Sequence, residues 1–335
     1  MSAAVAFDPS DYDALLDIKD SIVDQACCIL HKPYLSLNVG EEVSKVSVGI
    51  ICGSGLGQLA SLLTNTTTLP FQKIPGFPVP HVEGHKGNLV FGEMHGMRVV
   101  CLQGRFHPYE HGMNLAFCAT PVRIMHLLGI HTLIVSNAAG GINPLFKFGD
   151  LMIIKDHIFM PALAGFSPLV GLNDPRFGAR FVSVHDCYDQ TLRGIAKDIM
   201  KQQDLSVFEG IYLMSGGPQY ESPAEVRVFK TVGADALGMS TCHEVTVAKQ
   251  AGIRVFGFSL ITNIANLDAD TSVIVSHAEV LEAANAAGNR ATKFVSEMLK
   301  QIAVLPIPKV NPPVLERKRP RQQIANVPPL SVHRK

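Results

Sequence analysis

The chain has 335 residues, 47% of them apolar and only 17% charged, and its formal net charge is zero. This composition supports a substantial core and excludes an intrinsically disordered chain. The charge is unevenly spread, because seven Lys or Arg residues and one acid, Glu316, follow residue 308. The body before this point is therefore acidic, and we expect no general nucleic-acid partner, since phosphate backbones require a basic face.

Seven cysteines are present, an odd number, with no C-x-x-C pair and mostly inside apolar runs. This usage predicts reduced, buried thiols and a cytoplasmic protein. The opening "MSAAVAFDPSDYD" lacks the basic start and long apolar stretch of a secretion signal. Apolar runs of 18 residues are absent as well, so we expect no membrane partner.

The first predicted element is an amphipathic helix over residues 10–31, in which Leu15, Ile18 and Ile22 follow helical spacing and Ser10 is the expected cap. Six short apolar runs then predict buried strands at 46–51, 98–103, 131–136, 150–156, 210–215 and 254–261. Helical patterns lie between several of them, at 111–129, 188–202, 222–232 and 242–251. This alternation predicts an α/β fold with a parallel or mixed sheet.

A last helix is predicted to start at Ser276, which forms a capping-box pattern with Glu279. No repeat or linker interrupts the pattern before it ends, so residues 1–308 are expected to form one domain. Residues 309–335 contain repeated prolines and no apolar period, which predicts a disordered basic tail. Its "ERKRPR" run resembles a nuclear-import patch, but short basic runs are common and a solvated tail is the favoured interpretation.

A glycine-rich turn, "ICGSGLGQLA" at 51–60, follows the first predicted strand and suits a phosphate. It lacks the third glycine of the dinucleotide fingerprint, because position 58 is Gln, and no acid for a ribose follows at the required distance. It also lacks the Gly-Lys-Ser/Thr ending of a nucleotide P-loop. Taken alone, the turn is as consistent with a plain tight turn as with an anion site.

The run "HPYEH" at 107–111 matches the His-x-x-Glu-His zinc signature. That signature needs a helix to bring both histidines onto one face, and Pro108 lies inside it. We therefore interpret it as a chance match and predict no metal. A Gly-x-Ser-x-Gly elbow is also absent, which argues against a serine hydrolase.

Eight segments in order resemble the trimeric purine nucleoside phosphorylases over about residues 10–303: "IICGSGLGQLA", "VEGHKGNLVFG", "CLQGRFHPYE", "VSNAAGGINP", "GDLMIIKDHI", "GGPQYESPAEVR", "GADALGMSTCHEV" and "FGFSLITN". The resemblance implies a single domain with a mixed central sheet forming a distorted barrel flanked by helices, assembled as a homotrimer. It also implies reversible phosphorolysis of inosine, guanosine and their 2′-deoxy forms to the free base and (deoxy)ribose 1-phosphate. Inorganic phosphate is then a co-substrate, and no metal or organic cofactor is expected.

The resemblance also implies roles for individual residues. Phosphate contacts fall on Ser54, His85, Arg105, His107, Ala138 and Ser240. Nucleoside contacts fall on Tyr109, Phe177, Tyr220, Glu221, Met239, Asn263 and His277, with Phe177 supplied by a neighbouring subunit. The catalytic group comprises His107, Glu221 and Asn263. An amide at 263 favours 6-oxopurines, because it can donate to O6 while it accepts from N7–H.

Several positions depart from the family pattern. Ile264 stands where better-known members carry Lys, Gln219 precedes the aromatic residue at 220, and residues 264–276 diverge most. Two alternatives remain: a phosphorylase of 6-aminopurine thioether nucleosides, opposed by Asn263 and Ser240, and a non-catalytic nucleoside-binding protein. Complete retention of the phosphate set argues against the second alternative.

Overall fold

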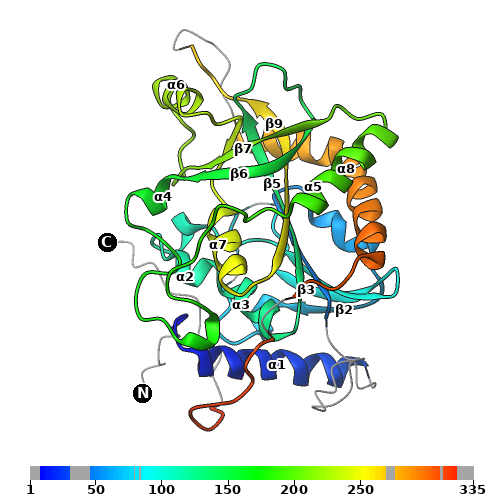
Figure 1. The fold of residues 1–335 in the computed structure, drawn as a ribbon, viewed down its shortest axis with the longest axis vertical. Helices are drawn as coiled ribbons and strands as arrows, with labels where there is room; N and C mark the ends of the chain where they lie inside the picture. The colour runs from blue at the N-terminus through cyan, green and yellow to red at the C-terminus, as the bar shows by residue number, and fades with distance from the viewer. Residues whose placement is uncertain are drawn as a thin grey trace.

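The central feature of the fold is one mixed sheet of nine strands that closes partly on itself (Figure 1). The structure, a computed structural model, describes residues 8–30, 46–78, 80–82, 84–268, 276–309 and 312–322. The strand order is β2-β3-β4-β1-β5-β8-β7-β6-β9, and β9 also pairs with β5. Strands β5, β8, β7, β6 and β9 thus form a closed barrel, with β1, β4, β3 and β2 extending from it. The predicted distorted barrel is confirmed.

The strands are β1 (Val48–Cys52), β2 (Thr64–Pro70), β3 (Asn88–Met94), β4 (Met97–Gln103), β5 (Thr132–Gly141), β6 (Leu151–Phe159), β7 (Phe208–Met214), β8 (Ala236–Gly238) and β9 (Arg254–Ile264). The helices are α1 (Tyr12–Leu30), α2 (Leu115–Cys118), α3 (Thr120–Leu127), α4 (Met160–Leu163), α5 (Gln190–Gln202), α6 (Pro223–Thr231), α7 (Cys242–Gln250) and α8 (His277–Val304). Short 3₁₀ turns are η1 (Gly57–Leu62), η2 (Phe71–Lys73), η3 (Pro108–Glu110) and η4 (Pro175–Phe177).

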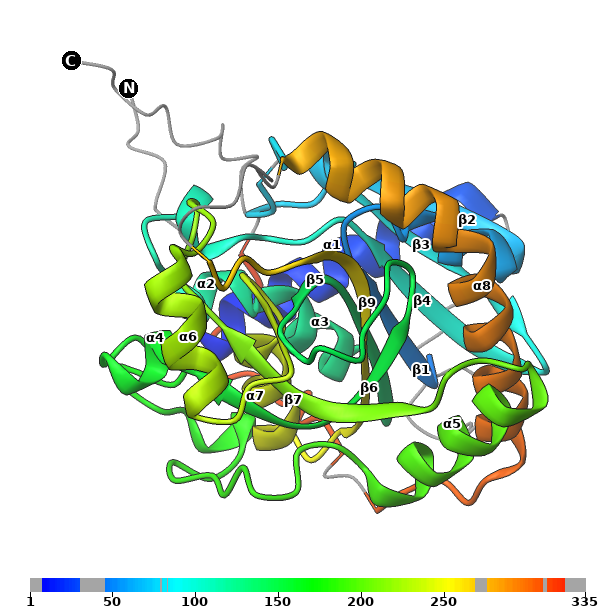
Figure 2. The same cartoon turned by 90° about the horizontal axis from the view of Figure 1, so that it is seen from above.

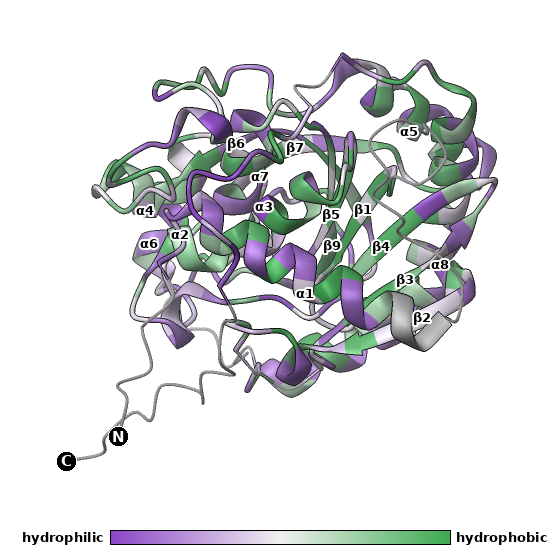
Figure 3. Cartoon of the chain, turned by 90° about the horizontal axis from the view of Figure 1, so that it is seen from below, coloured by the Kyte–Doolittle hydropathy of each residue, from purple (hydrophilic) through white to green (hydrophobic). Residues whose placement is uncertain are grey.

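Helices cover the sheet on both sides, with α8 and α5 over one side and α1, α3 and α7 over the other (Figure 2). The central strands β1, β4 and β5 are mostly apolar, as their colour in Figure 3 shows. A strand buried on both faces needs such a continuous apolar run instead of an alternating one. This is why the runs at 46–51, 98–103 and 131–136 identified their strands.

All six predicted strands are present, but the sequence missed β2, β3 and β8. Strand β2 carries threonines and an asparagine in place of an apolar run, β3 contains Gly92, and β8 has only three residues. The predicted helix over 111–129 is two helices, α2 and α3. Asn114 caps the first helix through a hydrogen bond from the Phe117 N–H, and Pro121 lies in the first turn of the second.

The predicted first helix is α1, but its cap is Asp11 and not Ser10. The Asp11 carboxylate accepts hydrogen bonds from the backbone N–H groups of Asp13 at 2.9 Å and Ala14 at 3.1 Å. The Ser10 hydroxyl donates instead to Asp8 at 2.7 Å. The capping box predicted at Ser276 and Glu279 is confirmed at the start of α8.

The C-terminal segment differs from its prediction. Residues 312–322 lie along α1 and make several ion pairs with it (Figure 1). The predicted disorder of the whole 309–335 tail is therefore wrong for 312–322. The rest of that tail, 323–335, lies outside the described residues. Composition missed the docking because it depends on charges that are distant in the sequence.

Cysteines 52, 101, 118, 187 and 242 are free and buried, as predicted. Across the part of the chain that the structure describes, no helix is both long and apolar enough to cross a membrane.

Candidate active site

A cavity of about 710 Å³ opens where several strands of the sheet end. The ends of β1, β4, β5, β8 and β9 all contribute to it, as expected for α/β sheets, in which ligands bind at the carboxyl ends of strands. The cavity is lined by all but two of the predicted site residues: Ser54, Arg105, His107, Tyr109, Ala138, Tyr220, Glu221, Met239, Ser240, Asn263 and His277. The two exceptions are His85, which lies just behind Ser54, and Phe177.

The glycine-rich turn places Ser54 at the end of β1. Gly53 is required by packing, because a Cβ there would lie 2.7 Å from the backbone of Asn137. Gly55 has a φ of +72°, and a Cβ there would meet the Ala284 methyl group at 2.3 Å. The turn therefore needs both glycines to bring the Ser54 hydroxyl into the cavity, where it lies 3.1 Å from Nε2 of His85. The proximity of His85 to the Ser54 hydroxyl favours an anion site over a plain tight turn.

Arg105 is held in a buried clamp beside the turn. Its side chain is 2% exposed, and its Nε and Nη2 donate to the two carboxylate oxygens of Glu244 at 2.8 and 3.0 Å. Nη2 also donates to the carbonyl oxygen of Ser136 at 3.0 Å. Within the described residues, Nη1 has no such partner, so this edge of the guanidinium group is available for an anion. The buried Glu244 carboxylate raises the pKa of Arg105 against the opposing effect of burial.

His85 and His107 lie beside Arg105, and the lowered pKa of each favours the neutral imidazole. Burial, and next the neighbouring His107 and Arg105, lower the pKa of His85 to about 3. Burial also lowers the pKa of His107, although the Glu110 carboxylate opposes this effect. Nδ1 of His107 lies 3.4 Å from Glu110, whose other oxygen accepts from the His81 N–H at 3.0 Å. Neutral imidazoles can donate one hydrogen bond each to an anion without requiring an acidic pH.

The "HPYEH" run forms the 3₁₀ turn η3, with Pro108 at its start, and not a helix. Its two histidines therefore do not lie on one helical face. No group of three or more potential metal ligands occurs among the described residues.

The cavity lining also includes a carboxylate and an amide, Glu221 and Asn263. Glu221 accepts a hydrogen bond of 2.6 Å from the Ser215 hydroxyl, and burial raises the pKa of Glu221 despite this bond. Asn263 lies near the end of β9 beside Gly140 of β5, where a Cβ would lie 3.1 Å from Nδ2 of the amide. The Thr262 hydroxyl donates to Oδ1 of Asn263 at 3.3 Å, which orients the amide. Both groups can thus recognise the edge of a planar polar ring.

Aromatic and apolar side chains complete the lining of the cavity. The ring of Tyr109 stacks on His107 with centroids 5.1 Å apart. Gly217 has a φ of +62°, and a Cβ there would lie 2.5 Å from Sδ of Met239, so this glycine leaves room for the methionine. His277 lines the cavity from the first residue of α8. The arrangement suits a flat apolar ring with polar edges.

Phe177 is elsewhere. It is 5% exposed and packs inside its own chain, with its ring 4.7 Å from the ring of Tyr12. Cζ of the Arg123 guanidinium group lies 3.9 Å from the centroid of the Phe177 ring. The prediction that Phe177 reaches a neighbouring subunit's site is therefore wrong, because the side chain belongs to the core between α1 and α3.

Sequence reasoning missed the residues that hold the site residues in place, namely Glu244, Ser136, Glu110, Ser215 and Thr262. One signal was available for Glu244, a carboxylate in the otherwise uncharged run "STCHEVTVA". A buried carboxylate needs a cation, and Arg105 is the buried cation nearby. Ile264 stands where better-known members of the family carry Lys. Its side chain is 44% exposed, and it is not among the residues that line the cavity, so this difference does not alter the cavity lining.

The fold and cavity define the class of protein: a mixed α/β fold whose cavity, lined by Arg105, Glu221 and Asn263, is suited to an anion and to a flat ring with polar edges. Residues 47–300 match the family described as "Phosphorylase superfamily". The chain is 49% identical over 257 residues to a purine nucleoside phosphorylase of Rattus norvegicus, covering 76% of this chain and 89% of that protein. It is 44% identical over 256 residues to purine nucleoside phosphorylase 1 of Geobacillus stearothermophilus, covering 76% and 91%.

Among solved structures, purine nucleoside phosphorylase of Schistosoma mansoni in complex with inosine matches with a TM-score of 0.78 at 37% identity. The match covers 90% of this chain and 99% of that one. The chain belongs to the phosphorylase superfamily, among its purine nucleoside phosphorylases, and is an enzyme that phosphorolyses purine nucleosides.

Proposed function

We propose that the cavity binds inosine, guanosine or their 2′-deoxy forms together with inorganic phosphate and releases the base and (deoxy)ribose 1-phosphate. The observation that carries this proposal is that one cavity is lined both by Arg105, held by Glu244, and by Glu221 and Asn263, held by Ser215 and Thr262. We call these two groups the anion end and the base end. Schistosoma purine nucleoside phosphorylases were solved with inosine, guanosine and hypoxanthine, and also with adenosine, so the preference for a 6-oxopurine in this chain rests on the Asn263 amide.

The anion end suits a phosphate ion. The open edge of Arg105 supplies a charged donor, and the hydroxyls of Ser54 and Ser240 supply neutral ones. His85 and His107 add imidazole N–H groups, and the backbone N–H at Ala138 is the remaining proposed contact. Because Glu244 already balances the charge of Arg105, phosphate is bound by many directed hydrogen bonds and not by a large excess of positive charge.

At the base end, the Glu221 carboxylate accepts from N1–H of the purine, and the Asn263 amide donates to O6 and accepts from N7–H. Tyr220 and Met239 pack against the base and ribose, while Tyr109 and His277 contact the sugar. Cleavage of the C1′–N9 bond leaves positive charge on the ribose and negative charge on the purine. Phosphate below C1′ stabilises the first and attacks it, and Asn263 stabilises the second, so placement of charge supplies much of the acceleration.

The remaining parts of the proposal come from the sequence. The family resemblance implies a homotrimeric assembly without a metal or organic cofactor, and the cysteine usage implies a cytoplasmic location. None of them requires Phe177 to cross between subunits. Analytical ultracentrifugation tests the assembly, because a trimer of this 36.2 kDa chain has three times the mass of one chain.

A coupled assay tests the function. Inosine is added with phosphate, and xanthine oxidase converts released hypoxanthine to uric acid. We expect uric acid only when both phosphate and enzyme are present. No uric acid under these conditions, with folded protein, would favour the non-catalytic nucleoside-binding alternative.

The affinity for hypoxanthine should fall in acid because of Glu221. Its pKa is raised, so its carboxylate gains a proton at a higher pH than an ordinary glutamate and then no longer offers two acceptors. Below that pKa we expect up to about tenfold weaker binding per pH unit. Isothermal titration calorimetry between pH 4.5 and 8, without phosphate, measures the affinity for hypoxanthine.

Glu221→Gln should bind hypoxanthine weakly, with an affinity that does not change with pH. The control Glu282→Gln, at an exposed position, should keep the pH dependence of the wild type. An unchanged slope in Glu221→Gln would exclude Glu221 as the titrating group.

A further inference from the structure

Helix α1 carries an acidic stripe, which we define as Asp11, Asp13, Asp17, Asp20 and Asp24. The four members within the helix follow the spacing i, i+4, i+7 and i+11, which places them along one side. Two of them are deeply buried: the side chain of Asp13 is 5% exposed and that of Asp17 is 1% exposed. Carboxylates are rarely buried to this extent unless they are paired.

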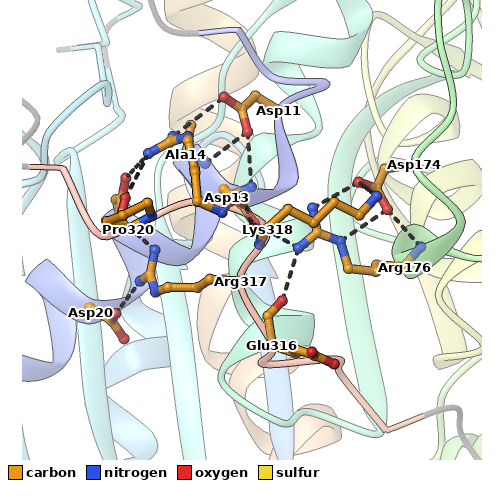
Figure 4. A network of polar contacts seen from close by, with 12 residues as sticks. Asp11, Asp13, Ala14, Asp20, Asp174, Arg176, Glu316, Arg317, Lys318 and Pro320 are labelled. Carbon is orange, nitrogen blue, oxygen red and sulfur yellow. Dashed lines mark hydrogen bonds and ion pairs between the residues drawn. The ribbon is translucent and has the colours of Figure 1, made fainter.

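The C-terminal run 316–322, which contains "ERKRPR", supplies the partners (Figure 4). Arg317 pairs with Asp17 and Asp20. Arg319 pairs with Asp17 at 3.0 Å and with Asp11 at 3.4 Å. At the outer end, Arg321 donates to Asp24 at 2.7 Å. Every member of the acidic stripe except Asp13 is thus paired with an arginine of this run.

Asp13 is bound in a different way, by the backbone of the same run. Its carboxylate accepts from the N–H groups of Lys318 at 3.1 Å and Arg319 at 2.9 Å. The N–H of Gln322 is likewise directed at Asp17, at 3.3 Å. Backbone donors require a defined path of the chain. The contact therefore depends on shape as well as on the attraction of opposite charges.

A second anchor lies in the loop at 174–176. Nη1 of Arg176 donates to Asp13 at 2.6 Å and to the carbonyl oxygen of Glu316 at 2.9 Å, so one guanidinium group joins helix, loop and tail. Asp174 accepts from Nη2 of Arg176 at 2.8 Å and from Nζ of Lys318 at 3.2 Å. The Arg176 guanidinium lowers the pKa of Asp174 well below its usual range. Three segments distant in the sequence thus meet in one network (Figure 4).

We propose that residues 316–322 form an intramolecular latch whose receptor is the acidic stripe of α1. In the latched protein the "ERKRPR" run is part of the folded body and is not an exposed basic patch available to nucleic acid or an import receptor. Most of these pairs are partly exposed, so salt competes with them. The latch is therefore expected to release as ionic strength rises, and only then to present its arginines.

A single tryptophan tests the latch, since the chain contains none. Leu315→Trp places the reporter beside the run at a position that is 38% exposed. At 50 mM NaCl we expect a high fluorescence anisotropy, because the reporter tumbles with the whole protein. Adding Arg317→Glu and Arg319→Glu, or raising NaCl to 0.5 M, should lower the anisotropy by about half or more. The matched control reverses two exposed cations elsewhere, Lys147→Glu and Lys230→Glu, and should leave it unchanged.

A charge swap then tests the pairing itself at the exposed outer end. Arg321→Asp should lower the reporter anisotropy, and Asp24→Arg added to it should restore it. The latch is wrong if reversing Arg317 and Arg319 leaves the anisotropy unchanged, and the assigned register is wrong if the swap fails to restore it. Neither readout uses catalysis, so failure of the latch and failure of the proposed function are distinguishable.

Truncation after Pro308 should lower thermal stability without impairing catalysis. No residue of the latch lines the cavity, so kcat for inosine is expected within about twofold of wild type. The Tm should fall by roughly 2–4 °C or more at 50 mM NaCl, since the acidic stripe loses the donors of residues 316–322 and its carboxylates then repel each other. This deficit should shrink at 0.5 M NaCl. Equal Tm values at low salt would show that the segment does not stabilise the body.

Discussion

Glu244→Gln is expected to lower the free energy of unfolding by about 3–5 kcal/mol, because it leaves a buried guanidinium without its counter-charge. Glu244 and Arg105 are each 2% exposed, and the carboxylate takes both hydrogen bonds from Nε and Nη2. Gln keeps the volume but can accept only one of these bonds. Denaturant unfolding of wild type and variant at one protein concentration measures the difference.

A surface carboxylate is the matched control for this prediction. Glu209 also pairs with cations, Arg193 and Lys197, but its side chain is 21% exposed. Glu209→Gln should therefore cost no more than about 1 kcal/mol. Arg105→Met added to Glu244→Gln should recover part of the loss by removing the unpaired charge, while activity with phosphate stays low. A Glu244→Gln variant within about 1 kcal/mol of wild type would contradict the clamp.

Asn263→Asp is expected to shift the substrate preference from inosine towards adenosine. In the proposed binding mode the wild-type amide donates to O6 and accepts from N7–H, whereas the 6-amine of adenine cannot accept that donor. Aspartate would accept from the 6-amine and repel O6. Each mismatched buried group costs about 1–3 kcal/mol, so the inosine-to-adenosine ratio of kcat/KM should fall by at least about tenfold. The Thr262 hydroxyl can still donate to the new side chain, which preserves its orientation.

The matched control is Asn114→Asp, which makes the same chemical change at the cap of α2, where either residue serves. Its ratio should equal that of wild type when both nucleosides are assayed at saturating phosphate. A ratio for Asn263→Asp within about threefold of wild type would mean that Asn263 does not recognise the base. The purine would then have to be placed differently in the cavity.

The parts of the fold that sequence predicted well are those in which local pattern and burial agree. Strands β1, β4 and β5 are continuous apolar runs because both faces are covered. Strand β2 is not predictable in this way, since most of its side chains are exposed. The closure of the barrel through β9 and β5 is also absent from any local pattern, and the family resemblance alone implied it.

In the candidate site, too, the sequence predicted the residues that lie in motifs and missed the residues that support them. Residues placed by the ordered motifs, such as Ser54, Arg105 and Asn263, do converge on one cavity. Their supports leave little trace in the sequence spacing: Glu244 holds Arg105 from 139 residues away, and Ser215 holds Glu221 through one hydroxyl hydrogen bond that follows no helix or strand period. Phe177 shows the limit of transferring a role from a loop motif, because an aromatic side chain in a similar run can equally fill the core.

The most direct test of the account is whether the enzyme transfers ribose to phosphate or to water in the cavity bounded by Arg105 and Asn263. Inosine and inorganic phosphate should be incubated with the protein, ribose 1-phosphate followed by ³¹P NMR, and hypoxanthine measured by chromatography. We expect one ribose 1-phosphate for each hypoxanthine released, and no release when phosphate is omitted. Release of hypoxanthine with free ribose and an unchanged phosphate signal would contradict it.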